Sequence, residues 1–191
     1  MHIGENEMRL LKLEKVKDGK YLKNYELTYY NKVGHEKVYE IVSRKELKDI
    51  SDLGEKNSGV SIVATMENRL LLLHEFRMGV NRKVYNLCAG MQEEGESIEA
   101  CIERELYEET GLNVKEIKHI LRPSYAAVAF SDVKTQIAFV EVTGEISDHT
   151  SENEMIHAAF YTPEELQVLL ETEEFSSRAQ LAAYQFMIAE K

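Results

Sequence analysis

The sequence from Gly90 to Leu112 reads GMQEEGESIEACIERELYEETGL, and its charge pattern is the strongest signal in the chain. Eight of these residues are glutamates, and Arg104 is the one basic residue among them. Glu105 and Glu109 are four residues apart, so in a helix they share a face and repel each other. A bound divalent cation would offset this repulsion, because hard cations take carboxylate oxygens as ligands.

The apolar residues of the same stretch predict that the helix packs against a core. At about 100° per residue, one apolar stripe contains Ile98, Ile102 and Leu106, with Cys101 at its edge. Glu109 falls in the middle of this stripe in projection, and Glu105 lies beside it. A carboxylate held against apolar surface is costly without a partner. The pattern therefore favours a metal-binding helix, with an ordinary acidic surface helix as the alternative.

The spacing of the fixed residues resembles the Nudix box, the signature of the Nudix hydrolase family. The pattern is Gly90, five residues, Glu96, seven residues and then Arg104-Glu105-Leu106-x-Glu108-Glu109-x-Gly111-Leu112. Every fixed position of the box is filled. The resemblance implies an α+β fold built as an α/β/α sandwich. It also implies hydrolysis of a phosphoanhydride with Mg²⁺ or Mn²⁺ as the cofactor.

The resemblance also assigns residues to the metal site. In the family, helix glutamates and the backbone carbonyl just before the box glycine hold the metal. Carried over, the ligands are Ala89 through its carbonyl, Glu105, Glu108 and Glu109. Glu105 and Glu109 are then the catalytic glutamates, while an indirect or solvated role is the alternative for Glu108. A cation held there can bind a diphosphate, neutralise developing charge and lower the pKa of a bound water.

The remaining box residues are expected to be structural. Glu96 and Arg104 match positions that form an ion pair in the family. This pair would orient the loop that begins at Gly90 and the helix that follows it, without taking part in the chemistry.

The flanks of the box resemble the ADP-ribose pyrophosphatase branch of the family. The similar stretches are Gly59–Ala64, Leu72–Arg77 and Asn86–Gly90. In that branch an N-terminal sheet is exchanged or packed across a homodimer and helps to form the adenosine site. Arg77 matches a position where the branch often has an arginine near the phosphates or ribose. Arg44 and Arg82 are further substrate-binding candidates, and a surface role is the alternative for each.

The loop after the box departs from the pattern of that branch. The branch has a Ser-Pro-Gly-x-Ser-[Asp/Glu] loop that often carries a catalytic acid. Here Val128 and Ala129 replace the Pro-Gly pair, while Ser131 and Asp132 remain. Asp132 is the candidate base or further metal ligand, and a turn residue is the alternative. Two other acidic residues are alternative bases: Glu152 and Glu154.

The chain is expected to divide into an N-terminal β-meander, residues 1–55, and a Nudix hydrolase domain, residues 56–191. Three strands within residues 8–43 are separated by turns at Asp18-Gly19 and near Asn31–Gly34. A small sheet of this kind needs cover for its apolar face. We therefore expect the meander to serve dimerisation and to contribute to the substrate site.

The rest of the chain mixes strands and helices, an order typical of α+β folds. The expected strands cover 60–65, 69–76, 85–89, 114–121, 135–142 and 155–161. The expected helices cover 98–109, 163–171 and about 177–189. Thr162, Pro163 and Glu165 predict a capping box at the start of the second helix.

Composition limits the classes of partner. The net charge of −11 argues against nucleic acid, although a metal can reverse the local sign for a small nucleotide. The two cysteines, Cys88 and Cys101, have no metal-binding spacing and are typical of buried thiols in a reducing cytosol. No apolar run is long enough for a signal peptide or a bilayer span. We expect a soluble cytoplasmic protein with no membrane partner.

These observations predict a metal-dependent pyrophosphohydrolase that acts on a nucleoside diphosphate derivative. ADP-ribose is the first expected substrate, with AMP and ribose 5-phosphate as products. The alternatives within this class are a nucleotide-sugar hydrolase, for example for GDP-mannose, and a hydrolase of damaged nucleoside triphosphates. From another class, the chain could be a non-catalytic nucleotide sensor on a Nudix scaffold.

Overall fold

The computed structural model describes residues 7–55, 57–147 and 155–189. It forms two compact units. The first unit contains Met1–Ser58 and Pro123–Thr135, and the second contains Gly59–Arg122 and Gln136–Lys191. The segment Pro123–Thr135 thus belongs with the N-terminal residues, although it follows the box helix in sequence.

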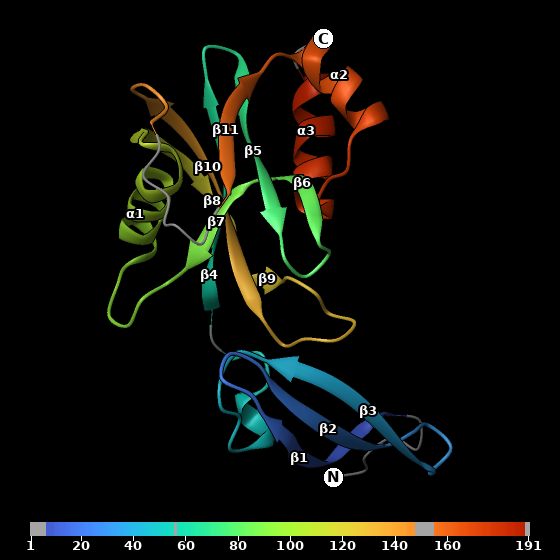
Figure 1. The fold of residues 1–191 in the computed structure, drawn as a ribbon. Helices are drawn as coiled ribbons and strands as arrows, with labels where there is room; N and C mark the ends of the chain where they lie inside the picture. The colour runs from blue at the N-terminus through green and yellow to red at the C-terminus, as the bar shows by residue number, and fades with distance from the viewer. Residues whose placement is uncertain (1–6, 56, 148–154, 190–191) are drawn as a thin grey trace. The chain divides into compact units, whose positions relative to one another are not determined.

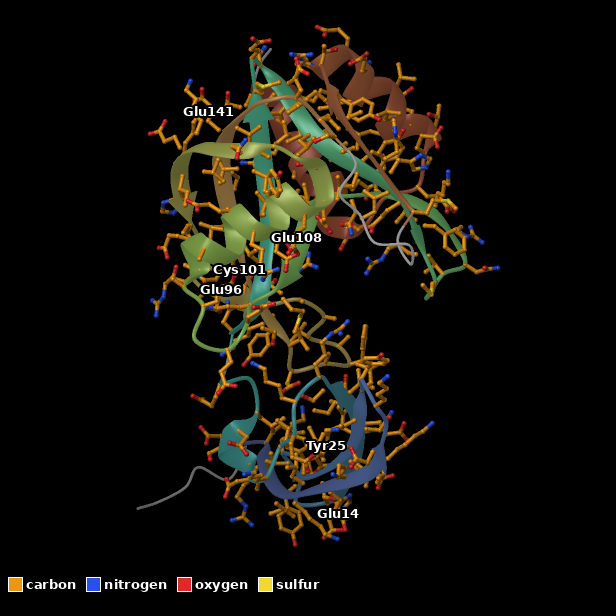
Figure 2. All side chains as sticks on the ribbon, turned by 60° about the vertical axis from the view of Figure 1, so that its left-hand side comes forward. Glu14, Tyr25, Glu96, Cys101, Glu108 and Glu141 are labelled. Atoms are coloured by element: carbon orange, nitrogen blue, oxygen red, sulfur yellow. The ribbon has the colours of Figure 1, made fainter. Side chains whose placement is uncertain are left out.

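The first unit contains the predicted three-stranded antiparallel sheet, in the order β1-β2-β3. Its strands are β1 (Arg9–Asp18), β2 (Lys23–Tyr30) and β3 (Glu36–Ser43), followed by a 3₁₀ turn, η1 (Ile50–Asp52). Its hydrophobic core contains Tyr25, Leu27, Ile41 and Leu47. Tyr25, labelled in Figure 2, accepts a hydrogen bond from the Leu47 amide at 2.8 Å through its hydroxyl. This contact ties the chain after β3 back to β2.

The segment Pro123–Thr135 is attached to β3 by one backbone and one side-chain hydrogen bond. The Val42 amide donates to the Phe130 carbonyl at 2.8 Å, and the Tyr39 hydroxyl donates to the Ala129 carbonyl. A short strand, β9 (Ser124–Tyr125), pairs with the beginning of β10 (Lys134–Thr143). The sequence predicts a loop here, and β9 was not expected.

The second unit is built on a sheet with the strand order β11-β5-β4-β10-β8. Besides β10, its strands are β4 (Asn57–Met66), β5 (Arg69–Arg77), β6 (Arg82–Asn86), β7 (Cys88–Met91), β8 (Asn113–Ile120) and β11 (Ile156–Tyr161). The prediction of a single short strand at 85–89 is wrong. Two strands meet at Leu87 instead, because β6 pairs with β5 while β7 pairs with β4.

Helices cover both faces of this sheet (Figure 1). One face packs against α1 (Ile98–Thr110), and the other packs against α2 (Pro163–Thr172) and α3 (Ser177–Ala189). Alternate side chains of β5 serve the two layers: Leu71 and Leu73 face α1, whereas Leu70 and Leu72 face α2 and α3. The predicted α+β class with an α/β/α sandwich is confirmed.

The ends of α1 follow from its sequence. The Ser97 side chain accepts a hydrogen bond from the Ala100 amide at 3.1 Å and caps the first turn. Gly111 ends the helix with φ 72°, a left-handed conformation that suits glycine. The apolar stripe is buried as predicted, with Ile102 and Leu106 both at 0% exposure. The glutamates beside this stripe are thereby held at the sheet.

Candidate active site

The site is built where β7 passes the last turns of α1. The Ala89 amide donates a hydrogen bond to Oε2 of Glu109 at 3.1 Å. Gly90 lies against Glu105 so closely that a Cβ on residue 90 would stand 1.7 Å from the Glu105 carboxylate carbon. With any other residue at this position, that carboxylate would have to move. One turn of helix thus presents two glutamates to consecutive residues of a strand.

These residues line a cavity of about 740 Å³ in the second unit. Its charged lining consists of Glu75, Arg77, Glu105, Glu108 and Glu109. Its other side chains are mostly apolar, and they include Phe76, Met78, Met91, Met155 and Ile156. The cavity therefore combines a carboxylate-rich wall with apolar surface, as a ligand with charged and uncharged parts would require.

Burial makes the charged state of the glutamates unfavourable. It raises the pKa of Glu109 to about 8, against the lowering effect of hydrogen bonds from the Cys88 thiol and the Ala89 amide. Burial also raises the pKa of Glu105, while the guanidinium of Arg104 opposes this change. A hard divalent cation would stabilise both carboxylates in their charged form.

The donor set fits such a cation. It consists of carboxylate oxygens and a backbone carbonyl, the ligands that Mg²⁺ prefers, and the glycine at residue 90 keeps the space beside Glu105 open. Among the residues that the structure describes, no three His, Cys, Asp or Glu side chains already stand in metal-binding geometry. The predicted ligands Ala89, Glu105, Glu108 and Glu109 line one cavity. To bind one cation, the glutamate side chains would have to move toward a common point.

Arg104 ties the box loop to the helix. Its Nε and Nη2 donate to the two oxygens of Glu96 at 2.8 and 2.9 Å, and Nη2 also reaches the Met91 carbonyl at 2.9 Å. Its Nη1 contacts Glu105 at 2.9 Å and Glu108 at 3.1 Å. The bidentate contact between Arg104 and Glu96 lowers the pKa of Glu96 to about 2. Figure 2 shows Glu96 in the loop before α1, and Cys101 and Glu108 on the helix.

The three arginine candidates lie in different surroundings. Arg77 lines the cavity and forms an ion pair with Glu75 at 3.2 Å. Arg82 forms an exposed ion pair with Glu174 at 2.7 Å. Arg44 belongs to the first unit, where it lines a cavity of about 90 Å³. The structure thus brings only Arg77 into the cavity that holds the box glutamates.

The candidate base Asp132 also belongs to the first unit and lines the same small cavity as Arg44. Its Oδ2 accepts a long hydrogen bond from the Gly54 amide at 3.4 Å. Its Oδ1 is buried and, within the described part of the chain, has no hydrogen-bond partner. The alternative bases Glu152 and Glu154 lie outside the described residues.

Sequence reasoning did not single out Glu75, which lines the cavity with only 5% of its surface exposed. A signal for it was present. Glu75 follows the apolar run Leu70–Leu73 within one strand. Residues two apart on a strand face the same side, so Glu75 shares its face with Arg77. A charged pair directly after a buried apolar run indicates a site.

Comparison with known families agrees with this geometry. The NUDIX domain model matches residues 55–184, well over half of the chain, and the chain therefore belongs to the NUDIX family. The match includes the cavity residues of β5, β7 and α1. Among the described residues, no helix is both long and apolar enough to cross a bilayer.

The similar individual proteins include a curated relative and a solved structure. The NAD-capped RNA hydrolase NudC of Vibrio parahaemolyticus serotype O3:K6 (strain RIMD 2210633) is 37% identical over 60 residues, which are 31% of this chain and 22% of NudC. The chain thus matches about a fifth of that relative. A solved structure, the crystal structure of ADP compounds hydrolase, aligns with a TM-score of 0.75 over 97% of this chain and 94% of that one. At 20% identity this likeness shows the fold.

Proposed function

We propose that the chain hydrolyses the pyrophosphate bond of a nucleoside diphosphate derivative with a divalent cation. The observation that carries this proposal is the buried Glu109 beside Glu105, Ala89 and Gly90 in one cavity. Such crowding of carboxylates at a sheet is costly without a cation. When bound, Mg²⁺ or Mn²⁺ would supply positive charge for the phosphoryl oxygens and lower the pKa of a bound water.

In this proposal the residues of the site have separate roles. Glu105, Glu108 and Glu109, with the Ala89 carbonyl, would hold the cation. Glu96 and Arg104 would keep the loop and helix in place, and Arg77 would contact the diphosphate. Water adds to one phosphorus as the bond to the bridging oxygen breaks, and the second phosphate leaves. The water proton passes to a base that stays a prediction from the sequence, because Asp132 belongs to the first unit.

ADP-ribose is the proposed substrate, giving AMP and ribose 5-phosphate. Two comparisons support an ADP-containing ligand. The similar solved structure is described as an ADP compounds hydrolase, and the curated relative acts on NAD-capped RNA. NAD itself contains two nucleotides joined through a pyrophosphate. The net charge of −11 favours a small nucleotide over a long polyanion as the ligand.

A substrate panel tests the proposal. It contains ADP-ribose, NAD, GDP-mannose, ATP and an oxidised nucleoside triphosphate, each with and without Mg²⁺ or Mn²⁺. Products are identified by liquid chromatography and mass spectrometry. We expect AMP and ribose 5-phosphate from ADP-ribose only when metal is present. Binding of ADP-ribose without consumption would instead identify a nucleotide sensor, and preference for GDP-mannose would identify a nucleotide-sugar hydrolase.

We also propose a cytoplasmic homodimer. The first unit exposes large apolar side chains on and around its small sheet, which a second copy could cover: Val16, Tyr21, Leu22 and Val38. Cys88 and Cys101 are free, buried thiols, in keeping with a reducing compartment. Light scattering coupled to size-exclusion chromatography should give twice the 22.0 kDa chain mass, and a mass of one chain would refute the dimer.

A further inference from the structure

Glu75 is a buried carboxylate in the cavity to which the Nudix box gives no role. It lies on β5 with 5% of its surface exposed. Both of its oxygens have partners: Asn86 Nδ2 donates to Oε1 at 2.6 Å, and Arg77 Nη1 donates to Oε2 at 3.2 Å. A buried carboxylate is tolerated when it is paired and hydrogen-bonded on both sides.

The contacts of Glu75 continue away from the cavity. Asn86, on β6, accepts a hydrogen bond from the Ser176 hydroxyl at 2.7 Å and another from the Leu87 amide at 3.0 Å. The Ser176 hydroxyl in turn accepts from the Ala179 amide at 3.3 Å in the first turn of α3. The orientation of Glu75 is therefore fixed by contacts with β6 and, through Ser176, with the start of α3.

Arg77 is the exposed member of this network. Its side chain is 57% exposed, whereas that of Glu75 is 6% exposed. A guanidinium carries five N–H donors in a fixed plane, so a single contact through Nη1 leaves donors that can meet phosphate oxygens. An exposed arginine loses rotamer freedom when it binds a ligand. An anchor that orders the side chain beforehand reduces this cost.

We propose that Glu75 is a positioning residue that holds Arg77 toward the diphosphate of the substrate, and that Asn86 and Ser176 keep Glu75 in place. This proposal rests on the proposed function, because it names how the same cavity binds the diphosphate. A direct metal contact by Glu75 is the rival role. It would require at least one oxygen to give up Asn86 or Arg77.

A double-mutant cycle separates the two roles. The variants are Glu75→Gln, Arg77→Ala and the double substitution. The first measurement is the Kd of inorganic pyrophosphate with Mg²⁺ by calorimetry, and the second is kcat and KM for ADP-ribose. We expect Arg77→Ala to weaken pyrophosphate binding by about tenfold or more, and Glu75→Gln by roughly threefold to tenfold. In the Arg77→Ala background, Glu75→Gln should add less than about twofold.

Further readouts identify a merely structural or a metal-binding role. Glu75→Gln should raise KM more than it lowers kcat, and it should leave the Mn²⁺ affinity, measured by paramagnetic resonance, unchanged. Ser176→Ala, which loosens Asn86 without touching the cavity, should reproduce a smaller part of the KM change. It carries the test if Glu75→Gln folds poorly by circular dichroism.

The matched control is Glu67→Gln. It breaks the ion pair between Glu67 and Arg69, which has the same two-residue spacing at the other end of β5 and a distance of 2.9 Å. This variant should leave pyrophosphate binding and KM unchanged. If Glu67→Gln changed pyrophosphate binding and KM as much as Glu75→Gln does, the loss of any arginine–glutamate ion pair on this strand would act through stability. That result would overturn the proposal.

The outcomes distinguish this proposal from the proposed function. Additive effects of Glu75→Gln and Arg77→Ala, or a loss of Mn²⁺ affinity in Glu75→Gln, would overturn the positioning role. A wild-type protein that binds no pyrophosphate would overturn it as well. If the double-mutant cycle shows the expected coupling in pyrophosphate binding but the wild-type protein hydrolyses no diphosphate, the proposed function is refuted and the role of Glu75 stands.

Discussion

Two arginine–glutamate pairs serve the same cavity in different ways. Arg104 contacts Glu96 through two nitrogens and also reaches Met91 and Glu105, with 25% of its side chain exposed. Among the residues that the structure describes, Arg77 forms an ion pair only with Glu75, and 57% of its side chain is exposed. The first pair joins a loop to a helix, whereas the second leaves a guanidinium at the cavity. The number of donors already used separates a structural arginine from one that can bind a ligand.

This difference predicts what removing each arginine should do. Removing the arginine whose donors are all engaged leaves several acceptors without partners, which costs stability. Removing the arginine with one contact costs little in the free protein, because the lost interactions form only with a ligand. Substitutions at the two arginines test this division, and a substitution at Glu109, the proposed metal ligand in the same cavity, has the largest expected effect.

The largest expected effect is that of Glu109→Gln. It should lower kcat by roughly 10²- to 10³-fold, because a neutral amide replaces a proposed metal ligand at the reacting centre. The fold should persist, and circular dichroism and the Tm check this point. Since the folded pKa of Glu109 is raised to about 8, the charged carboxylate destabilises the metal-free fold as pH rises toward that value. The variant should therefore equal or exceed the wild type in stability at pH 8.

A matched control for Glu109→Gln is Glu103→Gln, an exposed residue on the opposite side of α1. It removes the same charge from the same helix without touching the cavity. Turnover that is equal in the two variants would contradict the assignment of Glu109 to the metal site.

The next effect is that of Gly90→Ala. The new Cβ would stand 1.7 Å from the Glu105 carboxylate carbon, so the carboxylate or the strand must move. Displacement by about 1 Å can lower turnover by up to about 10²-fold, and overpacking costs about 1–3 kcal/mol of unfolding free energy. Denaturant unfolding and kcat measure the two losses.

The cause of the Gly90→Ala effect can be isolated with a second substitution. In a Glu105→Ala background the clashing carboxylate is absent, so Gly90→Ala should cost much less unfolding free energy than it does alone. An undiminished cost would locate the strain elsewhere, in the pairing of β7 with β4.

The substitutions Arg104→Ala and Arg77→Ala should have smaller effects. Comparing them is the sharpest test of whether one arginine is structural and the other binds a ligand. Arg104→Ala should lower the Tm by about 4 °C or more, because it releases contacts to Glu96, Met91 and Glu105. Arg77→Ala should change the Tm by less than about 2 °C while weakening pyrophosphate binding. Differential scanning calorimetry without ligand measures both. Similar Tm losses in the two variants would break the distinction drawn from their contacts.

Local pattern was enough to predict most of the elements around the box. The stripe of Ile98, Ile102 and Leu106 predicted the buried face of α1, and the strand alternation predicted the meander of β1, β2 and β3. These features depend on residues close in sequence. The Nudix box placed Glu105, Glu108 and Glu109 at one site, and they line one cavity.

Contacts between distant residues could not be predicted in the same way. The attachment of Phe130 to Val42 depends on backbone hydrogen bonds, which any side chains would permit. The division of residues 82–91 into β6 and β7 depends on which strand each one pairs with. The role proposed for Glu75 depends on Asn86, eleven residues away on the neighbouring strand. A single-sequence pattern contains no trace of these pairings.

The smallest predicted effect is the acid dependence of the Arg104 pair. The contact with Arg104 lowers the pKa of Glu96 to about 2 from its usual value of 4.5. A carboxyl group with a lowered folded pKa stabilises the fold above its unfolded pKa, and this contribution is lost as pH falls toward the folded value. Glu96→Gln should therefore lower the Tm at pH 7, and the difference from wild type should shrink between about pH 4.5 and pH 2.

Thermal melts of the wild type and Glu96→Gln across this range give the measurement, with Glu99→Gln as an exposed control in the first turn of α1. The control should track the wild type at every pH. A Tm difference for Glu96→Gln that stays constant down to pH 2 would mean that shape, and not charge, joins the loop to the helix. Arg104 would then be a packing residue, and counting its donors would no longer distinguish it from Arg77.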